Sequence, residues 1–278
     1  MRIDLGLDQH QLAWPDLQKR ATFAEDAGFD GIWVFDHFKA LYGPPEGPCF
    51  EAWTLLAGLA AVTTRVRLGP LVTGVTYRHP SVLAAEVVTV DHLSGGRVEL
   101  AMGAAWFRQE HEELGIDFPP PGERIARLDE ALHVMTTLMS EKDASFDGRY
   151  YRLQNATYRP LPVQRPHPPI WVGGGGERRL LPVAARQADV WHGFGTVAEL
   201  ARKSKLLDRL AAEAGREPSA IRRSTTLSLS EPWDEVLRTA EGHLGNGFTT
   251  LIADWPSEGW PRVEDFVERM LPELQGLR

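Results

Sequence analysis

The sequence predicts an α/β fold, and within that class a (β/α)8 TIM barrel, from three observations. Eight short, dense apolar segments alternate along the chain with eight segments of helical spacing. Strands that are buried on both faces and alternate with helices form parallel sheets, and eight such units in roughly 250 residues have the size of a barrel. The composition does not change between the two halves, so residues 1–278 are expected to form a single domain. An open, doubly wound sheet is the alternative.

The predicted elements follow one another in strand–helix order. Residues 2–8 alternate as a strand, and the helical pattern that follows them ends at Gly28. The helix after the third strand begins with Pro80, a residue suited to a first helical turn. The strands are expected at residues 2–8, 31–35, 66–72, 98–102, 169–173, 188–192, 222–229 and 247–253. The helices are expected at residues 15–28, 50–63, 80–93, 122–139, 177–187, 197–214, 232–244 and 262–276.

Two segments are longer than a minimal barrel needs. They are residues 105–121 and residues 140–168, and the second contains a predicted hairpin at 144–154 with Asp147-Gly148 at its turn. Barrels carry their active sites at the carboxyl ends of the strands, and long loops often act as lids. Both insertions are therefore expected at that face of the barrel.

Composition and charge exclude several classes of protein. The net charge is −8, which argues against nucleic acid or an anionic membrane surface as a partner. Cys49 is the one cysteine, which excludes an internal disulfide and fits a reducing cytoplasm. No stretch approaches the roughly 18 apolar residues of a membrane span, and the first residues do not resemble a signal peptide. A cytoplasmic protein that acts on a small molecule is expected.

Residues 170–179, Ile-Trp-Val-Gly-Gly-Gly-Gly-Glu-Arg-Arg, carry the strongest ligand signal. A strand runs into consecutive glycines and then into a helix. Glycines let backbone N–H groups approach a ligand closely, and a helix N-terminus favours an anion. The spacing matches neither the dinucleotide fingerprint nor a nucleoside-triphosphate loop. A ligand with one phosphate is therefore expected, and a glycine turn without a ligand is the alternative.

Other candidate residues follow the strands, where a barrel places its active site. Asp36 and His37 follow the second strand, and a histidine there can bond a ring carbonyl or transfer a proton near neutral pH. A purely structural histidine is the alternative. Trp106 and Trp191 follow the fourth and sixth strands and are expected to wall a substrate pocket. No catalytic metal is expected, because the histidines lack the close spacing of metal-binding motifs. These features suggest a phosphorylated ring cofactor that supplies the chemistry while the protein positions it.

Four motifs together make the chain resemble the bacterial luciferase-like monooxygenase family, and within it the branch of coenzyme F420-dependent oxidoreductases. They are Asp36-His37, the segment 68–80 that ends in Val-Thr-Tyr-Arg-His-Pro, the segment 91–97 (Asp-His-Leu-Ser-Gly-Gly-Arg) and the segment 168–176 (Pro-Pro-Ile-Trp-Val-Gly-Gly-Gly-Gly). Each motif is modest by itself, whereas their order and spacing are specific. Within the third motif, residues 94–97 are interpreted as a structural turn on the opposite face of the barrel.

The resemblance implies a barrel that binds a flavin or a deazaflavin at the carboxyl ends of its strands. It also implies a non-proline cis peptide after the third strand, at the place of Gly74-Val75. In deazaflavin-dependent members the residues that match Asp36 and His37 contact the ring, and His37 is the expected catalytic residue. The further cofactor-binding residues that the resemblance implies are Thr73, Gly74 and Val75 at the bulge, Gly103 and Ala104 along the ring, and Gly173, Gly174, Gly175 and Gly176 at the phosphate.

Two positions depart from the pattern of the family. The family usually has G-x-G after the fourth strand, where this chain has Gly103-Ala104-Ala105. Some sugar-phosphate dehydrogenases of the family carry a glutamate acid near this point, where this chain has Trp106 and Phe107, with Glu110 further on. Neither that acid nor that substrate is therefore carried over to this chain.

Three functions are compatible with these residues. The first is an oxidoreductase that transfers a hydride between coenzyme F420 and a small organic substrate. The second is a monooxygenase that uses reduced flavin mononucleotide (FMN) and oxygen, because FMN has a similar ring and phosphate. The third is a non-enzymatic, flavin-binding accessory protein. The Asp36-His37 pair favours the first, and the resemblance also implies a homodimer.

Overall fold

A computed structural model of the chain describes residues 1–277. The parallel strands are β1 (Arg2–Gly6), β2 (Gly31–Val34), β3 (Arg67–Pro70), β4 (Thr73–Gly74), β5 (Leu100–Gly103), β8 (Ile170–Gly173), β9 (Val190–Gly193), β10 (Arg222–Leu227) and β11 (Phe248–Ala253). The main helices are α1 (Trp14–Asp26), α2 (Ala52–Val62), α3 (Pro80–Ser94), α5 (Pro121–Ser140), α6 (Leu180–Gln187), α7 (Val197–Glu213) and α8 (Trp233–Leu244). The last predicted helix is divided into α9 (Trp260–Asp265), a π-helical turn at Phe266–Met270 and α10 (Leu271–Gly276).

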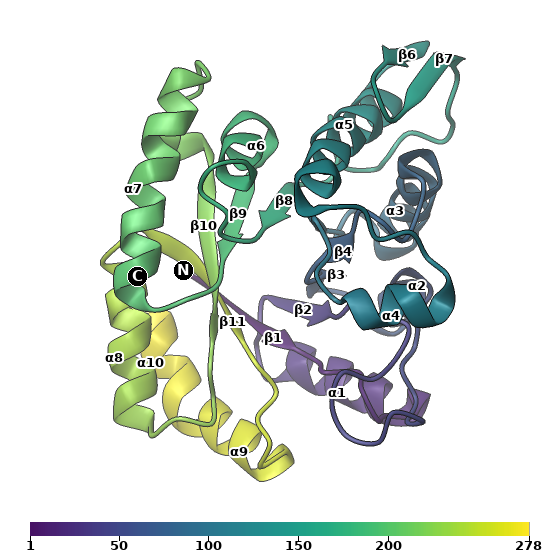
Figure 1. The fold of residues 1–278 in the computed structure, drawn as a ribbon. Coiled ribbons are helices and arrows are strands. Elements are labelled where there is room, and N and C mark those ends of the chain that lie inside the picture. The colour runs from purple at the N-terminus through teal and green to yellow at the C-terminus, as the bar shows by residue number, and fades with distance from the viewer. Residues whose placement is uncertain (278) are drawn as a thin grey trace.

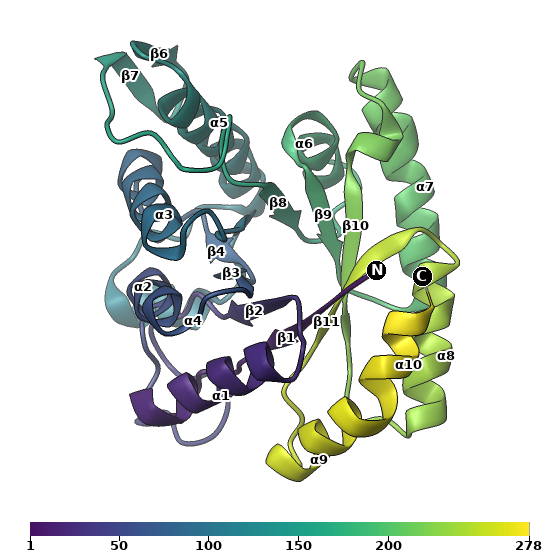
Figure 2. The same cartoon turned by 180° about the vertical axis from the view of Figure 1, so that it is seen from behind.

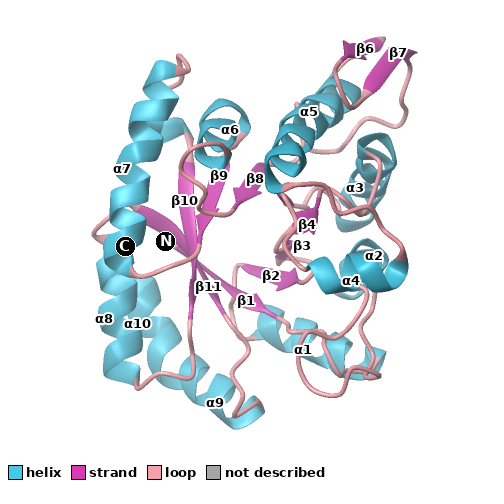
Figure 3. Cartoon of the chain, in the orientation of Figure 1, coloured by secondary structure: helices cyan, strands magenta, loops and turns pink. Residues whose placement is uncertain are grey.

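The strands form a nearly closed parallel barrel that the helices surround (Figures 1 and 3). The strand order is β3-β2-β1-β11-β10-β9-β8-β5-β4. The predicted third strand is divided, because β3 pairs with β2 while β4 pairs with β5. A bridge between Leu68 and Val98 joins β3 to the chain just before β5 and closes the ring. The predicted barrel is confirmed, and the open sheet is not observed.

Apolar side chains fill the barrel and the layer between its strands and the helices. Inside the barrel, five buried residues pack together: Trp33, Ala101, Trp171, Val190 and Ile252. A larger core joins the outer face of the strands to the helices. The short strands β8 and β9 are buried on both faces, which is typical of parallel sheets covered by helices.

The turn after α3 is structural, as interpreted from the sequence. Gly95 ends the helix with a φ of 66°, a left-handed conformation that glycine adopts without strain. Arg97 then donates hydrogen bonds to the carbonyl oxygens of Ala60 (2.9 Å) and Thr63 (2.8 Å). These bonds tie the end of α2 to the amino-terminal end of the barrel.

The two insertions lie at different ends of the molecule. Residues 105–121 include the helix α4 (Arg108–Leu114), which lies near α2 and β2 (Figure 1). Residues 140–168 include the predicted hairpin, β6 (Ala144–Asp147) and β7 (Arg152–Ala156), which packs on α5 (Figure 2). The same insertion passes the amino-terminal end of β5, where the Gln164 side chain donates to the carbonyl oxygen of Val98 at 2.8 Å. The expectation that this second insertion covers the site is therefore wrong.

No helix within residues 1–277 combines the length and the hydrophobicity that a bilayer crossing needs.

Candidate active site at the carboxyl ends of the strands

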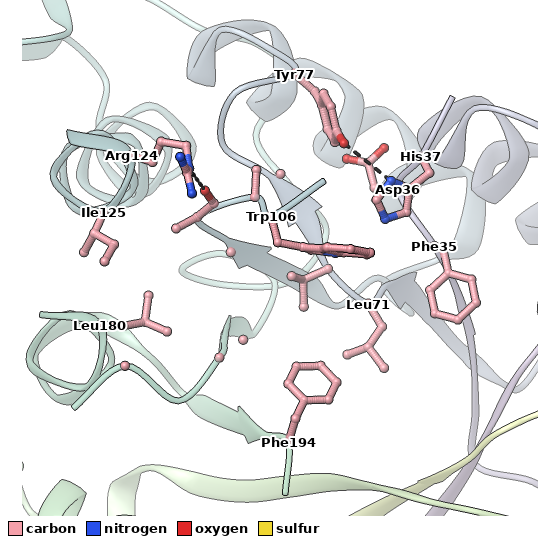
Figure 4. A pocket seen from close by; sticks show the side chains of 18 of the residues that line it. Phe35, Asp36, His37, Leu71, Tyr77, Trp106, Arg124, Ile125, Leu180 and Phe194 are labelled. Atoms are coloured by element: carbon pink, nitrogen blue, oxygen red, sulfur yellow. Dashed lines mark hydrogen bonds between the residues drawn. The ribbon is translucent and has the colours of Figure 1, made fainter. Parts of the chain in front are cut away.

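A cavity of about 560 Å³ opens at the carboxyl end of the barrel (Figure 4). Its wall comes from the ends of β2, β4, β5, β8 and β9 and from the first turns of α5 and α6. The predicted site residues that line it are Asp36, His37, Gly74, Gly103, Ala104, Trp106, Gly173, Gly174 and Gly176. The predicted site residues outside its lining are Thr73, Val75, Gly175 and Trp191. The remaining wall is mostly apolar.

His37 lies at the cavity wall with one ring nitrogen held from behind. Its Nδ1 is 3.0 Å from Oε2 of Glu110, a residue of α4 whose side chain is fully buried. A carboxylate accepts hydrogen bonds, so the Nδ1 of His37 carries the proton. Nε2 is therefore the ring nitrogen that is left to exchange a proton with a ligand in the cavity. Figure 4 shows the Tyr77 and His37 side chains pointing toward one another.

Glu110 is an acceptor for several donors at once. Its Oε1 accepts from the backbone N–H groups of Phe38 (2.8 Å) and Lys39 (3.1 Å), and its Oε2 also accepts from the Tyr77 hydroxyl. Burial by itself raises the pKa of Glu110, but the bonds from His37 and Tyr77 outweigh burial and lower it. Burial and the bond to Glu110 raise the pKa of Tyr77. At neutral pH the site therefore holds an ionised carboxylate and a protonated phenol behind the imidazole.

Asp36 is fixed by an arginine rather than free in the cavity. Arg78 donates to both carboxylate oxygens of Asp36, at 2.7 and 2.9 Å. The same guanidinium also pairs with Glu51 at the start of α2 and lies 3.1 Å from Glu86 of α3. Bidentate pairs of this kind fix geometry as well as charge. Asp36 therefore anchors the end of β2, and this holds His37 in place.

Two other histidines lie near the carboxyl ends of the strands, but neither has both the carboxylate partner and the place on the cavity wall that His37 has. Burial, with a smaller effect of His37, lowers the pKa of His10 to about 4. Burial lowers the pKa of His192 to about 3, and its Nδ1 lies 3.1 Å from the Ser224 hydroxyl. Both rings are neutral near pH 7. Of these three histidines, His37 alone combines a carboxylate within 3.0 Å with a place on the cavity wall.

The cis peptide lies three residues before its predicted position. The non-proline cis peptide is Leu71-Val72, not Gly74-Val75. Leu71 and Val72 both line the cavity. Thr73 is instead buried and accepts a hydrogen bond from the Trp53 indole at 2.9 Å. Val75 is buried in the main core. The surface against which a ring could lie is therefore made by Leu71 and Val72.

The glycine loop after β8 presents unpaired donors and two nearby cations. Within residues 1–277, the N–H groups of residues 175–179 donate to no protein acceptor. A Cβ built on Gly175 would lie 2.7 Å from the Lys203 ammonium, so this cation lies directly against the loop. The Arg179 guanidinium lies against Gly122 in the first turn of α5. Unpaired N–H groups beside positive charge fit an anion such as a phosphate.

The two predicted wall tryptophans have different positions. Trp106 lines the cavity and is 66% exposed, and it follows Ala105, whose φ is 58°. Trp191 is buried on the outer face of β9, where its ring packs against Phe248 and its indole N–H donates to the Gly174 carbonyl oxygen at 2.7 Å. The expectation that Trp191 walls the pocket is therefore wrong, and it supports the glycine loop from behind.

Sequence reasoning missed the role of Glu110. Because Trp106 and Phe107 occupy the place after the fourth strand, the sequence predicts no acid there. The insertion nevertheless turns into α4 and brings Glu110 to 3.0 Å from His37. Two features of the sequence could have indicated this role. Glu110 is a carboxylate on an insertion at the active face of the barrel, and His37 follows β2 at the same face.

The parallel barrel places its cavity at the carboxyl ends of the strands, and the glycine loop beside the cavity fits a phosphorylated ligand. A sequence model described as luciferase-like monooxygenase matches residues 1–258. The chain belongs to this family, and it is an enzyme of the oxidoreductase and monooxygenase class that uses a deazaflavin or flavin cofactor.

Relatives and solved structures agree with this assignment. An uncharacterized protein of Mycobacterium tuberculosis is 31% identical over 269 residues, which cover 91% of this chain and 92% of that protein. An F420-dependent glucose-6-phosphate dehydrogenase of Kineococcus radiotolerans is 37% identical over 177 residues, which cover 63% of this chain and 51% of that protein. The chain thus matches about half the length of that dehydrogenase.

The structural neighbours are more distant in sequence and show the fold. An F420-dependent secondary alcohol dehydrogenase, solved in complex with an F420-acetone adduct, superposes with a TM-score of 0.86 at 19% identity over 98% of both chains. The coenzyme F420-dependent tetrahydromethanopterin reductase of Methanopyrus kandleri gives a TM-score of 0.82 at 17% identity over 99% of both chains. A monooxygenase of Streptomyces bottropensis gives 0.75 at 21% identity over 98% of this chain and 99% of that chain.

Proposed function

We propose that the protein transfers a hydride between coenzyme F420 and a small organic substrate, with His37 as the catalytic acid–base residue. The observation that carries the proposal is the pairing of His37 with the buried carboxylate of Glu110, 3.0 Å from its Nδ1, at the wall of the cavity. Such a carboxylate fixes the tautomer and stabilises the imidazolium that forms when Nε2 takes a proton. The named F420-dependent relatives support the choice of cofactor.

The residues present fit a phosphorylated tricyclic cofactor. Leu71 and Val72 offer an apolar surface for one face of a ring, and Gly103 and Ala104 line the cavity beside them. The unpaired N–H groups of residues 175–179, with Lys203 close by, fit the phosphate. We therefore assign these residues to cofactor binding.

The cofactor and the side chains have different roles in the proposed reaction. When bound, the cofactor supplies or accepts the hydride, which no side chain can do. In the direction of reduction, His37 would bind a proton at Nε2 and give it to the carbonyl oxygen of the substrate. Glu110 and Tyr77 hold the imidazole in place, and Glu110 stays ionised throughout. In the direction of oxidation, Nε2 accepts the hydroxyl proton instead.

Reduced FMN with oxygen is the second candidate. It has a similar ring and phosphate, so the same glycine loop fits it. Solved monooxygenases of similar fold support this alternative at the level of the fold alone. We also propose that the protein works as a homodimer, which sedimentation analysis would test.

The proposal is tested by replacing His37 and a histidine of purely structural role. His37→Ala should lower kcat about 100-fold or more, the usual contribution of a positioned acid–base group. Its stability should fall by only about 1.5–3 kcal/mol, the net contribution of one hydrogen bond to a charged group, because Glu110 keeps its other donors. His79→Ala is the control, because His79 caps α3 by accepting from the N–H of Ser81. The control should lose about 1 kcal/mol with unchanged turnover.

The opposite result would show that His37 is not a catalytic residue. That result is a large loss of melting temperature in His37→Ala with a kcat equal to that of the wild type.

A further inference from the structure

One side chain joins the two ends of the insertion that carries Glu110. Arg124, near the start of α5, donates from Nε to the carbonyl oxygen of Ala104 at 2.8 Å and from Nη1 to that of Pro119. Ala104 directly precedes the insertion, residues 105–121, and Pro119 lies close to its end. Figure 4 shows Arg124 at the cavity with the first of these bonds drawn. Arg124 therefore fixes both ends of the insertion relative to each other.

Arg124 is a buried cation without a counter-charge. It is 7% exposed and lines the cavity. Within residues 1–277, its guanidinium donates to the two carbonyl oxygens alone and pairs with no carboxylate, so Nη2 is left without an acceptor. Burial and the charge of Arg108 lower the pKa of Arg124, which a carboxylate partner would raise. Arginine is rarely buried unless it is paired, so this wall of the cavity favours a ligand with a negative charge.

A second cation and the end of a helix add positive charge at the same place. The Arg179 guanidinium lies against Gly122 in the first turn of α5, and a helix N-terminus carries a partial positive charge. The acidic side chain of this turn, Glu123, pairs with Arg127 at 2.7 Å and leaves Arg124 uncompensated. An anion bound here would remove the cost of holding these charges together.

We infer that Arg124 is a positioning residue: an anionic group of the ligand in the cavity pairs with it, and the paired arginine holds the insertion so that Glu110 stays against His37. The inference rests on the proposed function, because it assigns a role toward the same acid–base pair. Without a counter-charge, the closed insertion carries the cost of a buried cation. An anion removes this cost, so ligand binding stabilises the closed insertion. The anion is a phosphate or a carboxylate, the groups whose geometry a guanidinium matches.

Paired probes test whether a negative charge holds the insertion. Hydrogen exchange of the backbone amides in residues 105–120, measured by mass spectrometry, reports how often the insertion opens. The first pair is F420 and dephosphorylated F420, which keeps the ring but lacks the phosphate and everything attached to it. The second pair, added to the F420 complex, is phenylglyoxylate and acetophenone, which share a phenyl ring and a ketone but differ in a carboxylate.

We expect the charged member of at least one pair to slow the exchange about threefold or more relative to the uncharged member. A difference within the first pair assigns the anion to the cofactor, and a difference within the second assigns it to a carboxylate of the substrate. Equal exchange within both pairs would overturn the inference.

Two variants separate the charge of Arg124 from its hydrogen bonds. Arg124→Met removes both, so the Kd of the charged probe should rise about tenfold and its effect on exchange should disappear. Arg124→Lys keeps the charge, but lysine lacks the planar guanidinium that reaches both carbonyl oxygens. Its Kd should stay within about threefold of the wild-type value, whereas kcat should fall about tenfold because the insertion no longer holds Glu110 against His37. Arg127→Met is the control with wild-type Kd, kcat and exchange, because Arg127 lies on the same helix, outside the cavity lining, and pairs with Glu123.

The variants also distinguish a positioning role from a purely structural one. Faster exchange along the whole chain of Arg124→Lys, including α8 on the far side of the barrel from α5 (Figure 1), would show that the arginine only stabilises the fold and would overturn the inference. Wild-type kcat and wild-type exchange in Arg124→Lys would also overturn it. Circular dichroism checks that each variant is folded, and the lysine variant keeps the test open if Arg124→Met does not fold.

The two proposals fail in different ways. If the wild type does not bind F420 in calorimetry, the proposed function fails. Inorganic phosphate then tests the role of Arg124 by itself, because it should slow the exchange of residues 105–120 in the wild type and not in Arg124→Met. The same exchange in both proteins would overturn the inference as well.

Discussion

Glu110→Gln separates the charge of Glu110 from its shape. The side-chain carbonyl oxygen of the glutamine can keep the hydrogen bonds from the N–H groups of Phe38 and Lys39, so the loop after β2 stays in place. The amide NH2 then faces His37 and the Tyr77 hydroxyl, and it cannot accept a hydrogen bond from either. His37 must accept at Nδ1 and carry its proton at Nε2. The variant therefore presents the wrong tautomer to the cavity and gives no charge to stabilise an imidazolium.

The size of the effect follows from the 3.0 Å separation of Nδ1 and Oε2. With an effective dielectric constant of about 20, the Coulomb energy of the charged pair is about 5 kcal/mol. Desolvation cancels much of it, and bonds to charged groups contribute about 1.5–3 kcal/mol net. A loss of this size in the transition state lowers kcat roughly 10- to 150-fold. The dependence of kcat on pH should also differ from that of the wild type, since an imidazolium that forms during the reaction loses its counter-charge.

The assay follows the absorbance of F420 with the best substrate found, from about pH 5 to pH 9. Glu113→Gln is the matched control, because Glu113 lies on the same helix and its 46% exposed side chain pairs with Lys39 at the surface. The control should keep its kcat and its pH profile. A Glu110→Gln variant with wild-type kcat and an unchanged profile would refute the reasoning that the carboxylate positions and charges His37.

Three further changes test the glycine loop, the backbone and the buried histidines. Gly175→Val covers the loop beside Lys203, so the Kd for the cofactor should rise about tenfold or more in calorimetry; an unchanged Kd would separate the loop from the phosphate. Ala105→Gly relieves a left-handed backbone that costs an L-residue about 1 kcal/mol, so urea unfolding should show unchanged or higher stability. The matched Ala85→Gly in α3 should lose about 1 kcal/mol, and an equal loss at both positions would contradict the strain. Burial lowers the pKa of His192 to about 3, so from about pH 6.5 down to 3 the unfolded chain binds a proton that the folded protein does not. Stability therefore falls as the pH is lowered through that window, and His192→Gln should reduce this fall by up to about 5 kcal/mol; an unchanged slope would argue against a neutral, buried ring.

The fold could be predicted because its signal is local and repeated. Each strand is a short apolar run bounded by turn residues, and each helix has a regular apolar face. The break between Leu71 and Val72 was not predicted. Gly69 and Pro70 lie directly before it and are residues that can interrupt a strand, but they do not specify that pairing changes from β2 to β5.

The site was only partly predictable because its geometry depends on long-range contacts. Gly174 and His37 are recognisable at the ends of single strands. Sequence does not indicate whether Trp191 points into the barrel or out of it, because β9 is buried on both faces and shows no alternation of apolar and polar residues. Glu110 reaches His37 across 73 positions of sequence, through an insertion whose path no local pattern fixes.

The central claim is that the cavity binds a deazaflavin, and a parallel titration of the purified protein with F420 and FMN tests it most directly. Quenching of tryptophan fluorescence reports binding, and Trp106 in the cavity wall is a suitable donor. The account predicts a Kd for F420 at least about tenfold below that for FMN. Tighter binding of FMN would contradict it and favour oxygen chemistry, and binding of neither would show that the glycine loop and His37 do not form a cofactor site.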